Sequence, residues 1–308
     1  MYLNIPQKEV HPGQLVTVCI KAVNRHVIFL GKQQFQIGVA YLNTPGNEKE
    51  MLQCDGVTEK VQQTMAEFSP KHCGITQIDI EKVFLQDYLG LIGTQKNFRG
   101  GCQLAVLPEP VLSTRVRTGM EKQQEYRYSA VADDDSDILD LRAFRPGDNL
   151  NHIHWNLSLR TDDLIVRQYG EQIDVKKVIL VDLSILNTAQ YRSRMDAVYT
   201  AVASIANLYV ENEVNTLILA WNGQKQSAEY LEVHDRTELN RAMIRLMQIP
   251  CSSRAGEHAA AVYLKDIEAQ GQQALFVTAG SYENNKVRIV NVEKIQLQEL
   301  IDELWEKI

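Results

Sequence analysis

The chain has 308 residues, of which 44% are hydrophobic and 23% charged, so it is long enough for two folded domains with substantial cores. Its 32 lysines and arginines against 39 aspartates and glutamates give a formal charge of −7. This balance argues against a nucleic-acid-binding protein, because such proteins carry a basic surface. No apolar run in the sequence approaches the roughly 20 residues that a membrane-spanning helix needs.

The cysteines indicate a reducing compartment. Cys19, Cys54, Cys73, Cys102 and Cys251 are scattered, and no two of them form a C-x-x-C pair. A secreted scaffold usually pairs its cysteines, and a zinc site clusters them. We therefore expect reduced thiols in a cytoplasmic protein.

The first part of the chain, residues 1–110, predicts an antiparallel, immunoglobulin-like β-sandwich. Residues 14–23 alternate between apolar and polar side chains after a His-Pro-Gly turn signal. Strands at this spacing, with turn signals between them, are typical of a sandwich, and Pro108 and Pro110 end the pattern. Further β-rich runs cover residues 35–42, 62–68, 75–84 and 102–107.

The last part, residues 173–308, predicts a Rossmann-like α/β domain. Val178–Val181 is a continuous apolar run, as expected of a strand that is buried on both faces of a parallel sheet. The alternation of strands and helices calls for a parallel sheet covered on both faces. The further elements that we expect are a helix at 189–212, a strand at 216–221, helices at 237–247 and 257–269, a strand at 274–278 and a helix at 292–308.

The connecting segment, residues 111–172, carries the sharpest local pattern. Pro146 and Gly147 are typical of a type II turn, because proline fixes one φ angle and glycine permits a positive φ at the next position. Asp148 can close this turn through its carboxylate. Trp155 lies among arginines and carboxylates in the sequence, where it can act as an apolar anchor or as a cation–π partner.

The order of residues in this segment resembles the signature of the bacterial family called domain of unknown function fifty-eight. That signature begins with an arginine, an aromatic residue and Pro-Gly-Asp. It continues with Ile-x-Trp, then a small residue two positions before an arginine, and finally a glutamate after a strand. The matching residues are Arg142, Phe144, Pro146, Gly147, Asp148, Ile153, Trp155, Ser158, Arg160 and Glu171, with Arg145 among them. Upstream, residues 87–91 resemble the family's Asp-Pro-Phe-Gly-Leu stretch, with Tyr88-Leu89 in place of Pro-Phe.

The resemblance implies that the last domain is similar to the von Willebrand factor type A domain. The metal site of that domain, a MIDAS-like site, uses a D-x-S-x-S loop, a threonine and a later aspartate to hold a hard cation. Here Asp182 and Ser184 match the first two positions, but Leu186 and Ala279 offer no side-chain oxygen, and residues 252–253 replace the threonine only loosely. We therefore expect a degenerate site. Helix capping or hydrogen bonding to a neighbouring loop is favoured over Mg²⁺ binding.

The other polar patterns in the sequence give weaker indications of a functional site. Asp133–Asp137 lacks the glycine and the terminal glutamate of an EF-hand, which favours a solvated acidic stretch. His152 and His154 would share a face in an extended segment, but no nearby cysteine or histidine completes a zinc site. No phosphate-binding, nucleophile-elbow or H-E-x-x-H motif occurs in the sequence, so we expect the protein not to be an enzyme.

These patterns favour a non-catalytic interaction or assembly factor. The resemblance implies work with a MoxR-type AAA+ ATPase and a client protein, at the cytoplasmic side of a bacterial membrane. Two alternatives stay open: a metal-dependent ligand-binding or adhesion domain that acts through Asp182 and Ser184, and a cell-envelope-associated hydrolase. For the motif residues we favour an architectural role over direct binding. In that role, ion pairs and a tryptophan plug would dock the segment onto the α/β domain.

The family resemblance also bears on membrane attachment. Members of the family commonly carry a pair of transmembrane helices just before the sandwich, whereas the β-pattern here begins almost at once after Met1-Tyr2-Leu3. We therefore expect either a trimmed form of a membrane-anchored protein or a naturally soluble member of the family.

Overall fold

The computed structural model forms two compact units, one made of residues 1–115 and 176–308 and the other of residues 116–175. The residues that the structure describes are 2–23, 30–42, 49–56, 61–98, 100–114, 127–128, 138–161, 163–171, 176–184, 190–252, 254–266, 274–280, 282 and 287–307.

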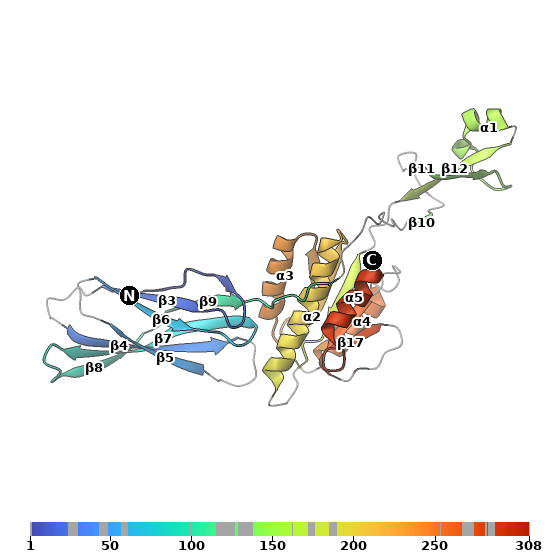
Figure 1. Ribbon diagram of the computed structural model, residues 1–308. Helices are drawn as coiled ribbons and strands as arrows, with labels where there is room; N and C mark the ends of the chain where they lie inside the picture. The colour runs from blue at the N-terminus through green and yellow to red at the C-terminus, as the bar shows by residue number, and fades with distance from the viewer. Residues whose placement is uncertain are drawn as a thin grey trace. The chain divides into compact units, whose positions relative to one another are not determined.

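The N-terminal part of the larger unit consists of two β-sheets, which Figure 1 shows in blue and green. All described strand pairs are antiparallel except β2 with β9. One sheet has the order β1-β3-β6, with β1 Tyr2–Asn4, β3 Val16–Val23 and β6 Val61–Phe68. The other has the order β2-β9-β7-β4-β5, with β8 on β7: β2 Glu9–Val10, β9 Gly101–Val106, β7 Gly74–Asp87, β4 Leu30–Tyr41, β5 Lys49–Gly56 and β8 Gly93–Asn97.

Alternating side chains of the two sheets form the core of this sandwich. Val16, Val18 and Ile20 are fully buried because successive residues of a strand point to opposite faces. They share one apolar cluster with Phe35 and Ile37 of the other sheet. The N-terminal β-sandwich predicted from the sequence is therefore present. Strands β5 and β8 were not predicted, because their mostly exposed, polar residues give no apolar alternation.

The C-terminal part of the same unit is an α/β domain with the sheet order β15-β14-β13-β16-β17. Strand β15 (Ser227–Val233) runs antiparallel to β14, and the other neighbours are parallel. The parallel strands are β13 Lys177–Val181, β14 Thr216–Asn222, β16 Ala274–Thr278 and β17 Arg288–Asn291. The helices are α2 Tyr191–Glu211, α3 Arg236–Gln248, α4 Ala255–Asp266 and α5 Leu297–Glu306.

Helices cover both faces of this sheet. Ile179 and Val181 of β13 lie in the apolar cluster that includes α2, α3 and α5, whereas Val178 and Leu180 lie in the cluster that includes α4. Both faces of the strand are therefore buried, which explains its continuous apolar run. The expected final helix at 292–308 starts too early: residues 292–296 form turns and a bend after β17, and α5 begins at Leu297.

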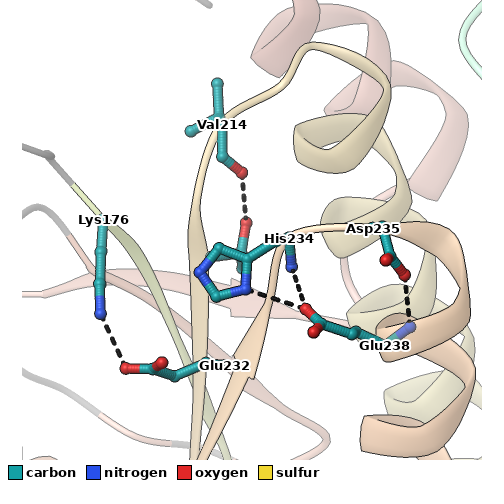
Figure 2. Close-up of polar contacts among 7 residues, drawn as sticks. Lys176, Val214, Glu232, His234, Asp235 and Glu238 are labelled. Carbon is teal, nitrogen blue, oxygen red and sulfur yellow. Dashed lines mark hydrogen bonds and ion pairs between the residues drawn. The ribbon is translucent and has the colours of Figure 1, made fainter.

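Helix α3 begins with a reciprocal pair of caps, which Figure 2 shows. The Asp235 carboxylate accepts a 2.7 Å hydrogen bond from the Glu238 N–H, and the Glu238 carboxylate accepts one of 3.0 Å from the His234 N–H. The first bond satisfies an N–H group that a helix start would leave unpaired. The second ties the Glu238 side chain back to the residue before the N-cap Asp235, in a variant of the capping box. In the same view Lys176, beside β13, pairs with Glu232 of β15 at 2.7 Å.

Asp196 of α2 joins the α/β domain to the sandwich. Its carboxylate accepts a 2.8 Å hydrogen bond from the Cys73 N–H and lies 2.6 Å from His72 Nδ1. Around this contact, Ile75 and Leu107 share the apolar cluster of α2. Burial raises the pKa of the Asp196 carboxyl, and the His72 contact opposes this shift. Within the larger unit, the sandwich and the α/β domain are therefore joined by apolar side chains that surround a polar contact at Asp196.

The smaller unit is a three-stranded antiparallel sheet with two short helices. The sheet order is β10-β12-β11. Its elements are β10 Arg127–Tyr128, β11 Ile138–Ala143, the 3-10 helix η1 Leu150–His152, α1 Trp155–Thr161 and β12 Ile165–Glu171. Across the described parts of both units, no helix is long and apolar enough to cross a bilayer.

We predict that Phe276→Ala destabilises the α/β domain by about 3–5 kcal/mol, because it removes a fully buried ring from β16 and leaves a cavity. The ring is 0% exposed and packs edge-on against Tyr282. Urea denaturation followed by circular dichroism measures the loss. The control is Met65→Ala, which truncates a side chain that is 58% exposed and should change stability by no more than about 0.5 kcal/mol. Equal midpoints for the two variants would contradict the prediction.

Candidate functional site

A tight turn organises the motif segment of the smaller unit. The Asp148 N–H donates a 3.0 Å hydrogen bond to the Arg145 carbonyl, so Pro146 and Gly147 occupy the two central positions of the turn. Gly147 has a φ of 109°, which other residues rarely adopt. A type II turn has this geometry, with proline first and glycine second.

The Asp148 carboxylate holds this turn to strand β11. It accepts two hydrogen bonds from the Arg142 guanidinium, at 2.8 and 2.7 Å, and one of 2.7 Å from the Arg145 N–H. Arg142 supplies the planar, bidentate geometry that suits a carboxylate. Its hydrogen bonds, together with that from the Arg145 N–H, lower the pKa of Asp148 to about 2. These three motif residues therefore stabilise one another.

Ser158 anchors helix α1 to strand β12. Its hydroxyl donates to the His154 carbonyl at 3.0 Å and accepts from the Ile165 N–H at 2.9 Å. Beside it, the buried Ile153 forms a β-bridge with Val166. The motif positions 153 and 158 thus serve the internal packing of this unit. Phe144, at the end of the hairpin, is half-buried.

The shared face of His152 and His154 was expected only for an extended segment, and the structure meets this condition only in part: Ile153 is extended, but His152 belongs to a helical turn. His152 ends η1, and His154 directly precedes α1. Two local caps explain the helical turns: the Asn149 side chain accepts from the Asn151 N–H, and His154 Nδ1 accepts from the Leu157 N–H. Asx and imidazole acceptors favour a helix start over an extended strand.

Helix α1 presents an exposed apolar face. Trp155 is 58% and Leu159 79% exposed, and residues four apart lie on the same side of a helix. We call this pair the Trp155–Leu159 face. Arg160 follows it and is exposed as well. Within the described residues no cation–π pair involves Trp155. The Glu171 side chain and Asp133–Asp137 lie outside the described residues.

The second candidate site lies at the carboxyl end of strand β13. The Asp182 carboxylate accepts a 2.6 Å hydrogen bond from the Thr278 hydroxyl through one oxygen and a 3.0 Å bond from the Ser184 N–H through the other. The Ser184 hydroxyl accepts a 3.1 Å hydrogen bond from the Gly256 N–H at the start of α4. Ser184 also bridges Ser252 in parallel. Four chain segments therefore meet around Asp182 and Ser184.

These side chains suit a hydrogen-bonded junction better than a divalent cation. A hard cation in a protein is usually held by several oxygen ligands, often two or more of them carboxylates, but the described side chains here include one carboxylate with both oxygens engaged. The α4 backbone closes one side, since a Cβ at Gly256 would lie 2.5 Å from Asp182 Oδ1. The Ser252 hydroxyl is buried without a hydrogen-bond partner among the described residues. Leu186 and Ser253 fall outside them. The favoured interpretation, hydrogen bonding to neighbouring loops, describes the observed contacts.

Sequence reasoning missed two members of this junction. Thr278 was counted only as a strand residue, although a hydroxyl at the carboxyl end of a parallel strand points to the edge where such sites form. Gly256 carried a weaker signal, as a small residue at the start of the helix after the serine pair. The Asp196–His72 contact gave no signal, because its partners are 124 positions apart.

With this geometry in view, the chain can be compared with known proteins. Residues 140–287 match the family described as Protein of unknown function DUF58. The DUF58 match includes strand β12, the motif from Arg142 to Arg160 and the Asp182 junction, and it supports the resemblance seen in the sequence. No curated protein matches the chain.

Solved structures resemble the chain only weakly. The CARDB domain of the PF1109 protein from Pyrococcus furiosus, in complex with di-metal ions, is 10% identical with a TM-score of 0.24, over 34% of this chain and 84% of that chain. The cohesin module from Clostridium perfringens ATCC13124 family 33 glycoside hydrolase is 11% identical with a TM-score of 0.24, over 34% of this chain and 95% of that chain. Likenesses this weak support no inference about function.

We predict that the turn of the smaller unit loosens in acid. Because the folded pKa of Asp148 is about 2 against an ordinary 3.8, the unfolded form takes up its proton first as the pH falls. The stabilisation is therefore complete well above 3.8 and is lost as the pH approaches about 2. Amide hydrogen exchange at Arg145 and Asp148, corrected for intrinsic rates, measures it.

Two variants test the origin of this acid sensitivity. Asp148→Asn should lower the protection near neutral pH and remove the pH dependence, whereas Asp163→Asn, which changes an exposed carboxylate in the same unit, should behave as the wild type. Protection that stays constant in the wild type from neutral pH to about pH 2 would refute the role of the Asp148 carboxylate.

We predict that Gly256→Ala destabilises the α/β domain by about 1–3 kcal/mol, because the added methyl group would overlap the Asp182 carboxylate. Thermal unfolding measures the change. In the matched control, Gly93→Ala, the nearest atom to the new Cβ is 3.8 Å away, so little loss is expected. A Gly256→Ala protein as stable as the wild type would mean that α4 does not pack tightly on Asp182.

Proposed function

We propose that the protein is a non-catalytic interaction or assembly factor that contacts its partner through the Trp155–Leu159 face. The observation that carries this proposal is the exposure of the two side chains, 58% and 79%, on a separate compact unit. Tryptophan is among the residue types that contribute most to binding energy at protein interfaces. An apolar pair displayed at helical spacing suits a groove or apolar patch on another protein.

The rest of the motif supports this role by fixing the helix that carries the face. Arg142 and Asp148 hold the turn before α1, and Ser158 ties α1 to β12. A rigid mount lowers the entropy cost of binding, because fewer groups are ordered when the partner arrives. We thus assign an architectural role to the arginine–aspartate contacts and a binding role to Trp155.

A non-catalytic role is also supported by the state of the thiols. Burial raises the pKa of Cys54 to about 11, that of Cys73 to about 12 and that of Cys102 to about 11. These groups are thiols at neutral pH, whereas a cysteine nucleophile acts as the thiolate. The Asp182 carboxylate is engaged by Thr278 and Ser184, which disfavours it as a general base.

The partner that we propose is a MoxR-type AAA+ ATPase at the cytoplasmic side of a bacterial membrane. The DUF58 match supports testing this partner first, because the resemblance implies it. We further propose that the α/β domain is of the von Willebrand A type. Its parallel sheet with helices on both faces, and the Asp182–Ser184 loop directly after the first strand, support this assignment.

The test is binding of the whole protein to the MoxR-type ATPase encoded in the same genome neighbourhood, measured by biolayer interferometry with and without ATP. We expect measurable association, and at least about tenfold weaker affinity for Trp155→Ala/Leu159→Ala, because truncated hot-spot residues cost 2 kcal/mol or more.

Two further measurements keep this test specific. Met65→Ala removes an equally exposed apolar side chain from the sandwich and should bind as the wild type. Unchanged circular dichroism of the double variant would show that the loss comes from the surface. No association in either nucleotide state, or equal affinity of wild type and double variant, would refute the proposal.

A further inference from the structure

The hairpin between β7 and β8 ends in an apolar tip that is independent of the Trp155–Leu159 face. Its large side chains point into solvent, with Tyr88 81%, Leu89 72%, Leu91 79% and Ile92 72% exposed. Single exposed apolar residues are normal on a protein surface, but a contiguous group marks an interaction site. We call residues 88–92 the apolar tip. Figure 1 shows β8 at one end of the sandwich.

The backbone of the tip is closed by its own hydrogen bonds. The Asp87 N–H donates to the Ile92 carbonyl at 2.9 Å, and the Gly90 N–H donates to the Asp87 carbonyl at 3.0 Å. The Asp87 carboxylate turns inward and accepts a 2.9 Å hydrogen bond from the Ile92 N–H. Gly90 has a φ of 70°, which allows the reversal. Three hydrogen bonds therefore close the turn that carries these exposed side chains.

Strand β4 braces the base of the tip. A Cβ at Gly31 would lie 2.9 Å from the Asp87 carbonyl carbon and from Tyr88 Cα, so only glycine allows this close approach. At its other end, β7 follows His72 and Cys73, which contact Asp196 of α2. Since β7 has 14 residues, the strand places the tip about 45 Å from that contact. The tip therefore lies at the end of β7 that is far from the α2 contact.

We propose that the apolar tip inserts into the interfacial region of a phospholipid bilayer. The four exposed apolar side chains lie within one short turn, which suits shallow insertion among lipid head groups. An apolar environment requires that backbone groups be hydrogen-bonded internally, and the tip meets this requirement at Asp87, Gly90 and Ile92. Tyrosine is also enriched where one end of a side chain is apolar and the other wet.

The charged side chains near the tip are compatible with its approach to a phospholipid surface. Lys32 forms an ion pair with Asp55 at 3.2 Å, and Gln34 donates to the same carboxylate. The Asp87 carboxylate is engaged within the turn. The carboxylates of Asp55 and Asp87 are therefore both engaged, while the exposed Lys96 of β8 adds a cation that can approach anionic head groups.

Vesicle flotation of the full chain tests this proposal, with vesicles of phosphatidylcholine mixed with phosphatidylglycerol. We expect the wild type to float with the vesicles, and Leu89→Ser/Leu91→Ser to partition at least about tenfold more weakly, because each substitution removes apolar area that the bilayer would bury. The matched control, Leu15→Ser/Met65→Ser, changes two leucine-sized side chains that are each 58% exposed elsewhere on the sandwich, and it should float as the wild type.

A fluorescence measurement separates insertion from a folding defect. In Leu89→Trp, vesicles should shift the emission of the new tryptophan to the blue and brominated lipid should quench it, whereas Met65→Trp should show neither effect. A wild type that stays in solution, or a double variant that floats as well as the wild type, would overturn the proposal. So would concentration-dependent dimerisation without lipid that the double variant loses, since the tip would then bind a second copy.

Discussion

The α/β domain depends on the burial of strand β13 on both faces. Val178, Ile179, Leu180 and Val181 are at most 1% exposed, and their side chains point alternately to opposite sides of the sheet. One helical layer could cover only half of them, so helices are required on both faces. The same constraint fixes where polar groups can gather. The strand has no polar side chain along its buried length, and the first carboxylate, Asp182, stands directly where the strand ends.

Asp182 then connects the ends of several elements because it is short and charged. Its two oxygens accept from Thr278, at the end of β16, and from its own loop at Ser184. Ser184 in turn receives the Gly256 N–H of α4, one of the N–H groups that a helix start leaves unpaired. The carboxyl edge of the sheet is thus tied to the helical layer that covers it. The aspartate and the serine therefore have a structural role at this edge of the sheet.

How much the sequence could predict depends on whether the signal was local. The apolar runs at 178–181 and 274–278 and the alternation in 14–23 gave their strands within two residues, since burial of these residues decides both pattern and structure. Strand β15 was missed because its exposed face is polar and carries charged side chains. The turn at Pro146-Gly147 was visible in the sequence, but the helical turns at 150–152 and 155–161 were not, because they rest on caps from Asn149 and His154.

Long-range features lay beyond a single sequence. The division into residues 1–110, 111–172 and 173–308 stays a prediction; the structure separates residues 116–175 and groups the sandwich with the α/β domain. The contacts of Asp196 with His72 and Cys73 contribute to this grouping, and no local pattern marks them. The exposed surfaces follow another rule. A leucine at helical or turn spacing looks the same in sequence whether it is buried or displayed. The structure distinguishes the two cases, because Leu159 and Leu89 are 79% and 72% exposed. Ser158 ties the helix of Leu159 to β12, and hydrogen bonds close the turn of Leu89, so both leucines are held at the surface, where contiguous apolar groups mark interaction sites.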